Sequence, residues 1–226
     1  MDERSDIEYM WYSNDNWKSF RVFLGGYILS VLPSQGKLLY HITRIDNLPS
    51  ILKSAYAKRL LRESEISFCD IADPEIISKR EAYKTDLSKF VLFHFFVRNP
   101  FDCAVCHNFG AENMAIIAIG RNTSMVRNSK IIPTHPLDVA EPDIYPYDEG
   151  LQLIEWDILD MQEGRDYSDP EIRKACMAEC LISRIVRPRE FEYVYVKDAV
   201  AERRVRGMEG SDGIRIVVNP RMFPGA

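Results

Sequence analysis

The chain reads Tyr40-His41-Ile42-Thr43 early in its length and Ala178-Glu179-Cys180-Leu181-Ile182 late in it, and each stretch places polar side chains on what otherwise looks like a buried strand. A strand alternates its faces, so His41 and Thr43 point the same way, toward whatever pocket lies beside the sheet. Glu179 stands at the head of an apolar run, where a carboxylate is costly to bury without a partner. These positions therefore predict a functional site built on a sheet.

Each of these residues also has a structural explanation. A histidine on an apolar strand, taken alone, is more often a satisfied core histidine than a ligand, and this applies to His41. Glu179 taken alone is explained by an ion pair with Lys174. Arg184 is a less suitable partner, because it lies an odd number of positions away and faces the other side of a continuous strand. His94, inside another apolar run, is interpreted as structural.

The composition favours one folded domain. The chain has 226 residues, of which 46% are hydrophobic, and this is enough to build a core. We divide it into an N-terminal extension, 1–36, with an acidic start and an aromatic cluster, and a domain, 37–226. The longest apolar stretch, 22–32, is too short to span a bilayer and lacks the features of a secretion signal. We therefore expect a cytoplasmic protein without membrane contact.

The formal net charge of −5 excludes a protein that coats nucleic acid by bulk electrostatics. A local basic face remains compatible with nucleic-acid binding. Its candidate residues are Arg184, Arg187, Arg189, Arg203, Arg204 and Arg206.

The five cysteines are more consistent with free thiols in a reducing compartment than with a disulfide framework. Residues 103–107 read Cys-Ala-Val-Cys-His, the c-type haem attachment pattern, but no second feature supports haem and we interpret the match as coincidence. A four-thiolate zinc site from Cys103, Cys106, Cys176 and Cys180 is left open, although the last spacing is wider than a usual zinc knuckle.

Patterning predicts a mixed α+β domain instead of a regular alternation of parallel units. The N-terminal extension is expected to contain a helix and to end in a turn. Expected strands are 39–43, 65–69, 90–97 as the central strand, 114–119, 129–132, one beginning at Glu179, 193–196 and 214–218. Expected helices begin near Pro49 and cover 73–83, 151–159, 169–175 and 199–206, and 133–150 is expected to be a long irregular segment.

Few residues of the chain are candidates for catalysis or ligand binding. The chain has no Gly-rich phosphate loop of the dinucleotide or nucleoside-triphosphate type and no spacing that supports a Ser-His-Asp arrangement. What remains is His41 with Thr43, Arg80, His135 and Glu179, each weak by itself.

The order and surroundings of these residues resemble the DarT family of DNA ADP-ribosyltransferases. The resemblance covers residues 38–200, and its first and last blocks are the most specific. Four blocks carry it: LYHITRIDNLPSIL (39–52), DPEIISKR (73–80), VLFHFFVRNP (91–100) and AECLI (178–182). A tyrosine is common in the third block of the family's pattern. This chain departs from the pattern there and has His94 or Phe95.

The resemblance implies an α+β fold with an ADP-ribosyltransferase-like split mixed sheet, flanking helices, and NAD bound as co-substrate in a cleft. It places His41, Thr43, Asn47 and Arg80 at NAD, makes Glu179 and Arg80 the catalytic residues, and implies no metal. Cleavage of the bond to nicotinamide builds positive charge on the ribose, which the Glu179 carboxylate would stabilise.

The implied reaction is transfer of ADP-ribose from NAD to a base in single-stranded DNA. By the same resemblance the protein would be the toxin of a toxin–antitoxin pair, with a macrodomain antitoxin that removes the modification. The alternative is a binding module that keeps the fold but has lost turnover, or a relative directed at RNA or protein.

Overall fold

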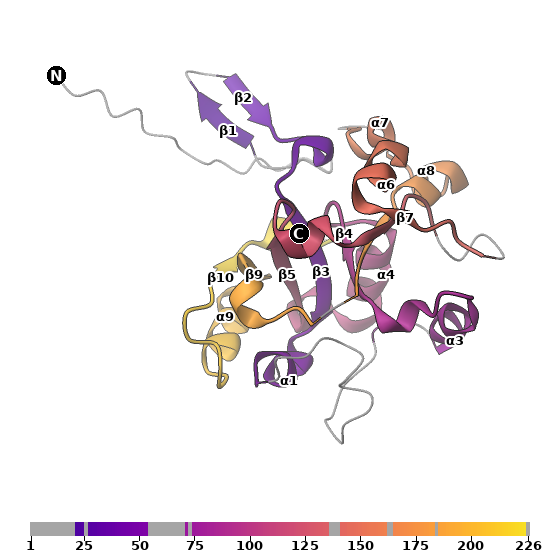
Figure 1. The fold of residues 1–226 in the computed structure, drawn as a ribbon. Helices are drawn as coiled ribbons and strands as arrows, with labels where there is room; N and C mark the ends of the chain where they lie inside the picture. Colours follow the sequence, from indigo (N-terminus) through magenta and orange to yellow (C-terminus); the bar gives the residue numbers. More distant parts are fainter. Residues whose placement is uncertain are drawn as a thin grey trace.

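The structure is a computed structural model that describes residues 21–24, 27–53, 71, 74–135, 141–161, 165–183 and 185–224 (Figure 1). Eight of the described strands form one mixed sheet in the order β10-β9-β5-β3-β4-β8-β6-β7. The pair β9–β10 is parallel and every other pair of this sheet is antiparallel. The bounds of these strands are β3 Leu38–Arg44, β4 Val91–His94, β5 Met114–Gly120, β6 Lys130–Ile132, β7 Tyr145–Pro146, β8 Glu179–Ile182, β9 Tyr193–Val196 and β10 Ile216–Val218.

The sheet is split in its middle. Strand β3 pairs with β5 along its whole length, but it meets β4 at the single pair Tyr40–His94. Strand β4 in turn pairs along its whole length with β8, so that His94 lies opposite Glu179. The sheet therefore consists of two halves, β10-β9-β5-β3 and β4-β8-β6-β7, joined at one point. This confirms the split mixed sheet that the resemblance to the DarT family implied.

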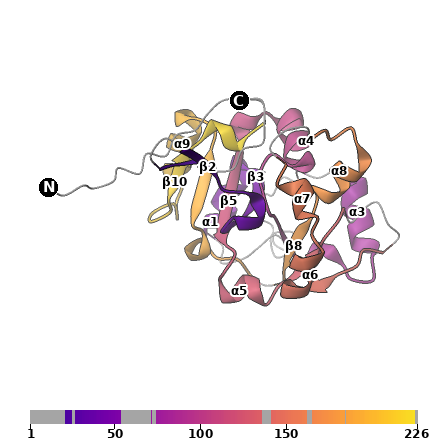
Figure 2. The same ribbon diagram turned by 90° about the horizontal axis from the view of Figure 1, so that it is seen from above.

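Helices cover both faces of each half. The bounds of the described helices are α1 Leu48–Lys53, α3 Pro74–Ala82, α4 Pro100–Phe109, α5 Ser124–Arg127, α6 Tyr147–Leu153, α7 Trp156–Leu159, α8 Pro170–Ala175 and α9 Ala199–Arg206. Figures 1 and 2 show α9 at one end of the molecule and α3 at the other.

Four apolar clusters correspond to these two halves and two faces. On the first half, α1 and α9 pack against one face and α4 against the other. On the second half, residues of α5, α6, α7 and α8 pack against one face, and Tyr83 and Leu87, which follow α3, pack against the other. Glu179 shares a face with Leu181, its neighbour but one, and this is the face on which α3 and α4 lie.

The sequence explains where several helices begin. Asn99 accepts a hydrogen bond from a first-turn backbone N–H of α4, and Asp169 and Asp198 do the same for α8 and α9. A proline follows the cap in α4 and α8, at a position whose missing N–H has no intrahelical partner. These local signals fix the helix starts independently of packing.

Most predicted elements are confirmed, with several differences. The helices α4 and α5 were not predicted, and the strand predicted for 90–97 is shortened to β4, Val91–His94. The segment predicted to be irregular, 133–150, contains β7 and the start of α6, and the single helix predicted for 151–159 is divided into α6 and α7. Residues 21–24 and 27–30 pair as the hairpin β1–β2 (β1 Arg21–Leu24, β2 Tyr27–Ser30), whereas a helix was expected somewhere in the extension. The strand predicted for 65–69 lies outside the described residues.

The predicted turn at the end of the extension is present as a 3₁₀ turn, Pro33–Gln35. The division into an extension, 1–36, and a domain, 37–226, stays a prediction. Among the residues that the structure describes, no helix is both long enough and apolar enough to cross a bilayer.

A buried arginine ties this turn to the sheet. Arg121 is 6% exposed and its guanidinium donates to the backbone carbonyls of Pro33, Leu38 and Phe95. It also lies over the Phe95 ring, 5.2 Å from the centroid. One side chain therefore holds the segment before β3, the start of β3 and the chain after β4 in place.

We predict that Arg121→Leu lowers the free energy of unfolding by about 3 kcal/mol or more, because three buried carbonyls lose their donors at about 1–3 kcal/mol each. The matched control is Arg127→Leu, which removes an exposed ion pair with Asp148 and should change stability by less than about 1 kcal/mol. Urea unfolding followed by circular dichroism measures both. Equal effects of the two substitutions would contradict the structural role of Arg121.

Candidate active site

The split between β3 and β4 lies beside a buried ion pair. Glu179 begins β8 and its side chain is 3% exposed. Arg80, on α3, forms two parallel hydrogen bonds to it: Nη1 donates to Oε1 at 3.0 Å and Nη2 donates to Oε2 at 2.7 Å. The predicted partner Lys174 is therefore replaced by Arg80, and Arg184 lies outside the described residues. Of the neighbours Lys79 and Arg80, Lys79 is the exposed one.

The ion pair determines the charge of Glu179. Burial by itself would raise the pKa of this carboxyl, but the charge and hydrogen bonds of Arg80 outweigh burial and hold the pKa below its usual value. Smaller contributions in the same direction come from His94 and His135. Glu179 is thus a buried carboxylate that stays ionised at neutral pH and can face a developing positive charge.

His94 lies next to Glu179 in the sheet. Tyr40, His94 and Glu179 are directly opposed across β3, β4 and β8, so their side chains share one face. The His94 ring is buried against Phe101, and its Nδ1 lies 3.2 Å from the backbone oxygen of Ala178. Burial lowers the pKa of His94, and although Glu179 opposes this effect, the net shift is downward.

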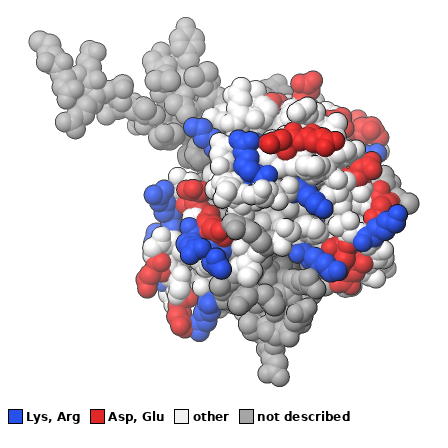
Figure 3. Space-filling model, in the orientation of Figure 1, with Lys and Arg blue, Asp and Glu red and all other residues white. Residues whose placement is uncertain are grey.

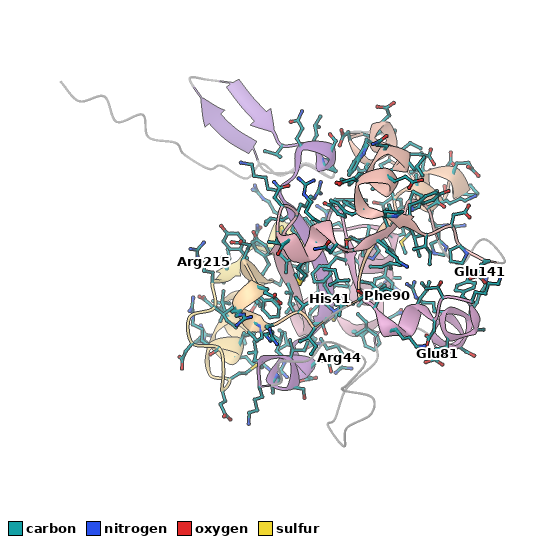
Figure 4. All side chains as sticks on the ribbon, in the orientation of Figure 1. His41, Arg44, Glu81, Phe90, Glu141 and Arg215 are labelled. Atoms are coloured by element: carbon teal, nitrogen blue, oxygen red, sulfur yellow. The ribbon has the colours of Figure 1, made fainter. Side chains whose placement is uncertain are left out.

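His41 occupies the split itself. Its Nδ1 lies 2.8 Å from the carbonyl oxygen of Leu92, and its ring is 5.5 Å from that of Phe93. The ring therefore bridges β3 and β4 beyond their single backbone pair. Figure 4 labels His41 near the centre of the molecule and Arg44 further along β3.

Thr43 and Asn47 lie at the end of β3, where the chain turns into α1. Each is 1% exposed, and Asn47 Nδ2 donates to Thr43 Oγ1 at 3.3 Å. This hydrogen bond helps to fix the corner between β3 and α1, beside the split. Their predicted role at NAD, like that of His41 and Arg80, stays a prediction.

The cysteines do not converge. The described residues contain no group of three or more His, Cys, Asp or Glu side chains placed to hold a metal. Cys106 lies in the cluster under α4, whereas Cys176 and Cys180 lie on the other half of the sheet, so the four-thiolate zinc arrangement has no geometric support. Burial raises the pKa of each thiol, to about 12 for Cys106 and Cys180, which disfavours thiolates at neutral pH.

The predicted basic face is partly neutralised. Asp46 forms ion pairs with Arg44 and with Arg204, and Arg206 pairs with Glu202. On the face drawn in Figure 3, basic and acidic side chains are intermixed and do not segregate into one cationic field.

Sequence reasoning missed the turn that connects β4 to α4. Arg98 has a φ of 62°, the left-handed region that residues other than glycine seldom adopt. The Asp102 carboxylate accepts a hydrogen bond from its backbone N–H at 2.7 Å, and the Tyr167 hydroxyl donates to its carbonyl at 3.1 Å. The signal in the sequence was Asn99-Pro100 followed by an acidic residue, which is the start of a capped helix.

Comparison with known proteins decides the family. The family model described as "ssDNA thymidine ADP-ribosyltransferase, DarT" matches residues 40–223, which is most of the chain. This chain belongs to the DarT family. The family predicted from the four sequence blocks is confirmed.

Relatives of this DarT chain include the DNA ADP-ribosyl transferase-DNA ADP-ribosyl glycohydrolase fusion protein of Thermosipho africanus (strain H17ap60334). The two are 29% identical over 192 residues, which cover 82% of this chain and 49% of the fusion protein. The solved structure of Thermosipho africanus DarTG in complex with ADP-ribose has a TM-score of 0.68 at 26% identity, and the match covers 83% of this chain and 51% of that one. The chain thus spans about half the length of this relative.

Two further DarT structures, from Thermus sp. 2.9, are matched over nearly their whole length. The complex with ADP-ribosylated ssDNA has a TM-score of 0.69 at 18% identity, and the match covers 83% of this chain and 96% of that one. The complex with NAD+ has a TM-score of 0.66 at 17% identity, with 83% and 97% covered. At this level of identity the likeness establishes a shared fold.

We predict that Arg80→Ala lowers the free energy of unfolding by about 3–5 kcal/mol at neutral pH, because it leaves a buried carboxylate without its partner. A glutamate whose folded pKa is depressed contributes stability above its unfolded pKa, and this contribution is lost as pH falls through the folded value. The difference between wild type and variant should therefore shrink below the ordinary pKa range of glutamate.

Urea unfolding at several pH values measures this difference. Adding Glu179→Gln to Arg80→Ala should recover part of the loss, and Lys79→Ala, at the exposed neighbour, should cost less than about 0.5 kcal/mol. A loss for Arg80→Ala that stays constant down to acid pH would show that the ion pair is not its cause.

Proposed function

We propose that this chain transfers ADP-ribose from NAD to thymidine in single-stranded DNA. The observation that carries the proposal is the ionised Glu179, held by Arg80 beside the split in the sheet. Membership of a family described by this reaction supports the choice of substrates. A module that had lost turnover would have no need for a buried carboxylate at the head of β8, so this placement favours the enzyme.

The proposed reaction breaks the bond between nicotinamide and the anomeric carbon of the ribose. Nicotinamide leaves with the bonding electrons as a neutral molecule, and the ribose acquires oxocarbenium-like positive charge. Thymidine has one ring N–H, at N3; this nitrogen gives up its proton to solvent water and forms the new bond to the anomeric carbon. Glu179 stabilises the cationic ribose electrostatically, and a fixed charge in a buried site does so with little reorganisation.

Arg80 does not have to leave for Glu179 to act. A carboxylate has about four lone-pair positions on its two oxygens, and Arg80 uses one on each. An oxygen can therefore also accept a ribose hydroxyl while Arg80 stays in place. In the proposal Arg80 keeps the carboxylate ionised and oriented, and its positive charge lies close to the NAD pyrophosphate or the acceptor base.

His41 suits the proposed NAD site because it lies at the split and is only half-buried. The Leu92 carbonyl can only accept, so the neutral ring carries its proton on Nδ1 and Nε2 is an acceptor. An acceptor suits a ribose hydroxyl. Because Thr43 and Asn47 bond to each other in the corner of β3, we assign them the task of fixing this strand under the bound NAD.

The proposed partner is a macrodomain antitoxin that removes ADP-ribose from DNA. The Thermosipho africanus relative carries a DNA ADP-ribosyl glycohydrolase in the same polypeptide, and this chain matches about half of it. In this proposal the protein is a cytoplasmic toxin, and the counteracting activity resides in a separate chain or in a linked domain.

We predict that Glu179→Gln reduces transfer by at least about a hundredfold while NAD affinity changes little, since the charge acts mainly in the transition state. Glutamine still bonds to Arg80, so the fold is kept, whereas alanine would leave a buried guanidinium unpaired. The assay is mass spectrometry of oligonucleotides after incubation with NAD. Three oligonucleotides are compared: single-stranded DNA that contains thymidine, the same DNA with thymidine replaced, and the RNA equivalent. Transfer to RNA or to protein alone would overturn the substrate assignment.

A second prediction concerns His41. His41→Ala should weaken NAD binding by about 1–3 kcal/mol, because the ribose hydroxyl that becomes buried on binding loses its hydrogen-bond acceptor. Isothermal titration calorimetry on the Glu179→Gln background measures affinity without turnover. The matched control is His107→Ala on the exposed side of α4, which should bind NAD as the parent does. Unchanged affinity for His41→Ala would remove this residue from the NAD site.

A further inference from the structure

His94 lies beside the backbone that leads into Glu179. Its Nδ1 lies 3.2 Å from the oxygen of Ala178, the residue before Glu179. A carbonyl oxygen can only accept a hydrogen bond, so the proton must be on Nδ1. The ring is buried, and it lies opposite Glu179 in the ladder between β4 and β8. His94 is therefore bonded to the backbone before Glu179 and lies in the same cross-strand row as Glu179.

We propose that His94 is a positioning residue that fixes the backbone leading into Glu179, and that it supports transfer only as the neutral ring with its proton on Nδ1. The proposal rests on the proposed function, because it concerns the same carboxylate. It assigns a task to one of the two residues, His94 and Phe95, that stand where a tyrosine is common in the family.

The charges around the ring explain why protonation matters. The titratable and charged groups that face it are Glu179 on β8, Arg80 on α3, His135 after β6 and Tyr40 on β3, while α4 contributes the apolar Phe101 ring. A second proton on the ring would add a cation beside the Arg80–Glu179 pair. The transition state is itself cationic, so this added charge opposes it directly.

Burial favours the neutral ring under ordinary conditions. The pKa of His94 is lowered chiefly by burial, with Arg80 and His135 acting in the same direction and Glu179 against it. Neutral His94 therefore dominates at neutral pH, and the charged form appears only as pH falls below the usual histidine range. The proposal therefore predicts an acid limit on transfer that is set by the His94 ring.

Two substitutions separate the backbone role from the charge. His94→Asn keeps an N–H donor at the position of Nδ1 and cannot become a cation; His94→Leu removes both the donor and the charge. Transfer to thymidine-containing DNA is measured from about pH 8 to about pH 5. Asp102→Asn is the control, because burial raises the pKa of Asp102 to about 7 and this group titrates in the same window.

We expect His94→Asn to keep most of the wild-type kcat at pH 8 and to lose the acid limit that the wild type shows. His94→Leu should lose about tenfold or more in kcat with little change in KM for NAD, as expected from a misplaced carboxylate. Asp102→Asn should keep the acid limit. An acid limit that persists in His94→Asn, or that disappears in Asp102→Asn instead, would overturn the proposal.

Nitrogen NMR of the histidine rings tests the same proposal without turnover. The chain has four histidines, so the His94 signals can be assigned by comparison with His94→Asn. We expect the Nδ1–H tautomer and a titration midpoint below that of a free histidine; a neutral ring protonated on Nε2 would overturn the proposal. If the wild type modifies no DNA but the NMR result holds, the proposed function fails while the placement of the proton on His94 stands.

Discussion

The single pair between Tyr40 and His94 is the constraint on which the arrangement of the site depends. It holds the two halves of the sheet together at one level and leaves β3 and β4 apart elsewhere. Next to that pair the His41 ring bridges the two strands, and His94 lies opposite Glu179 in the β4–β8 ladder. If β3 and β4 were paired along their whole length, the sheet would have no break between them. If the two halves were unconnected, the distance between these strands would not be fixed.

The Arg80–Glu179 pair is better explained by function than by stability. Burying two charges carries a desolvation cost that their attraction seldom exceeds, and apolar replacements of similar volume are often neutral or stabilising. A sequence selected for stability alone would have little reason to place a carboxylate opposite His94 and at the head of an apolar strand. The carboxylate is kept ionised by Arg80, which donates a hydrogen bond to it although the two residues are 99 positions apart in the sequence.

The sequence predicted local features well and long-range partners poorly. Alternation indicated β3, and apolar runs indicated β5 and β8, because these signals lie within a few residues of each other. The partner of Glu179 was not predictable from spacing, since Arg80 reaches it across the fold. The break between α6 and α7 was missed for the same reason, since packing imposes it. The left-handed Arg98 did have a local signal, the capped start of α4 at Asn99-Pro100.

The order of strands in the sheet has a consequence for how the chain folds. Strand β8 pairs with β4, about 85 positions earlier, and it also separates β4 from β6. The second half of the sheet can therefore close only after residue 182 is available, and contacts of such long range make folding slow. On a ribosome, the segments that carry His41 and Arg80 emerge long before the strand that carries Glu179. A partly synthesised chain that ends before residue 179 therefore lacks the carboxylate that we propose for transfer.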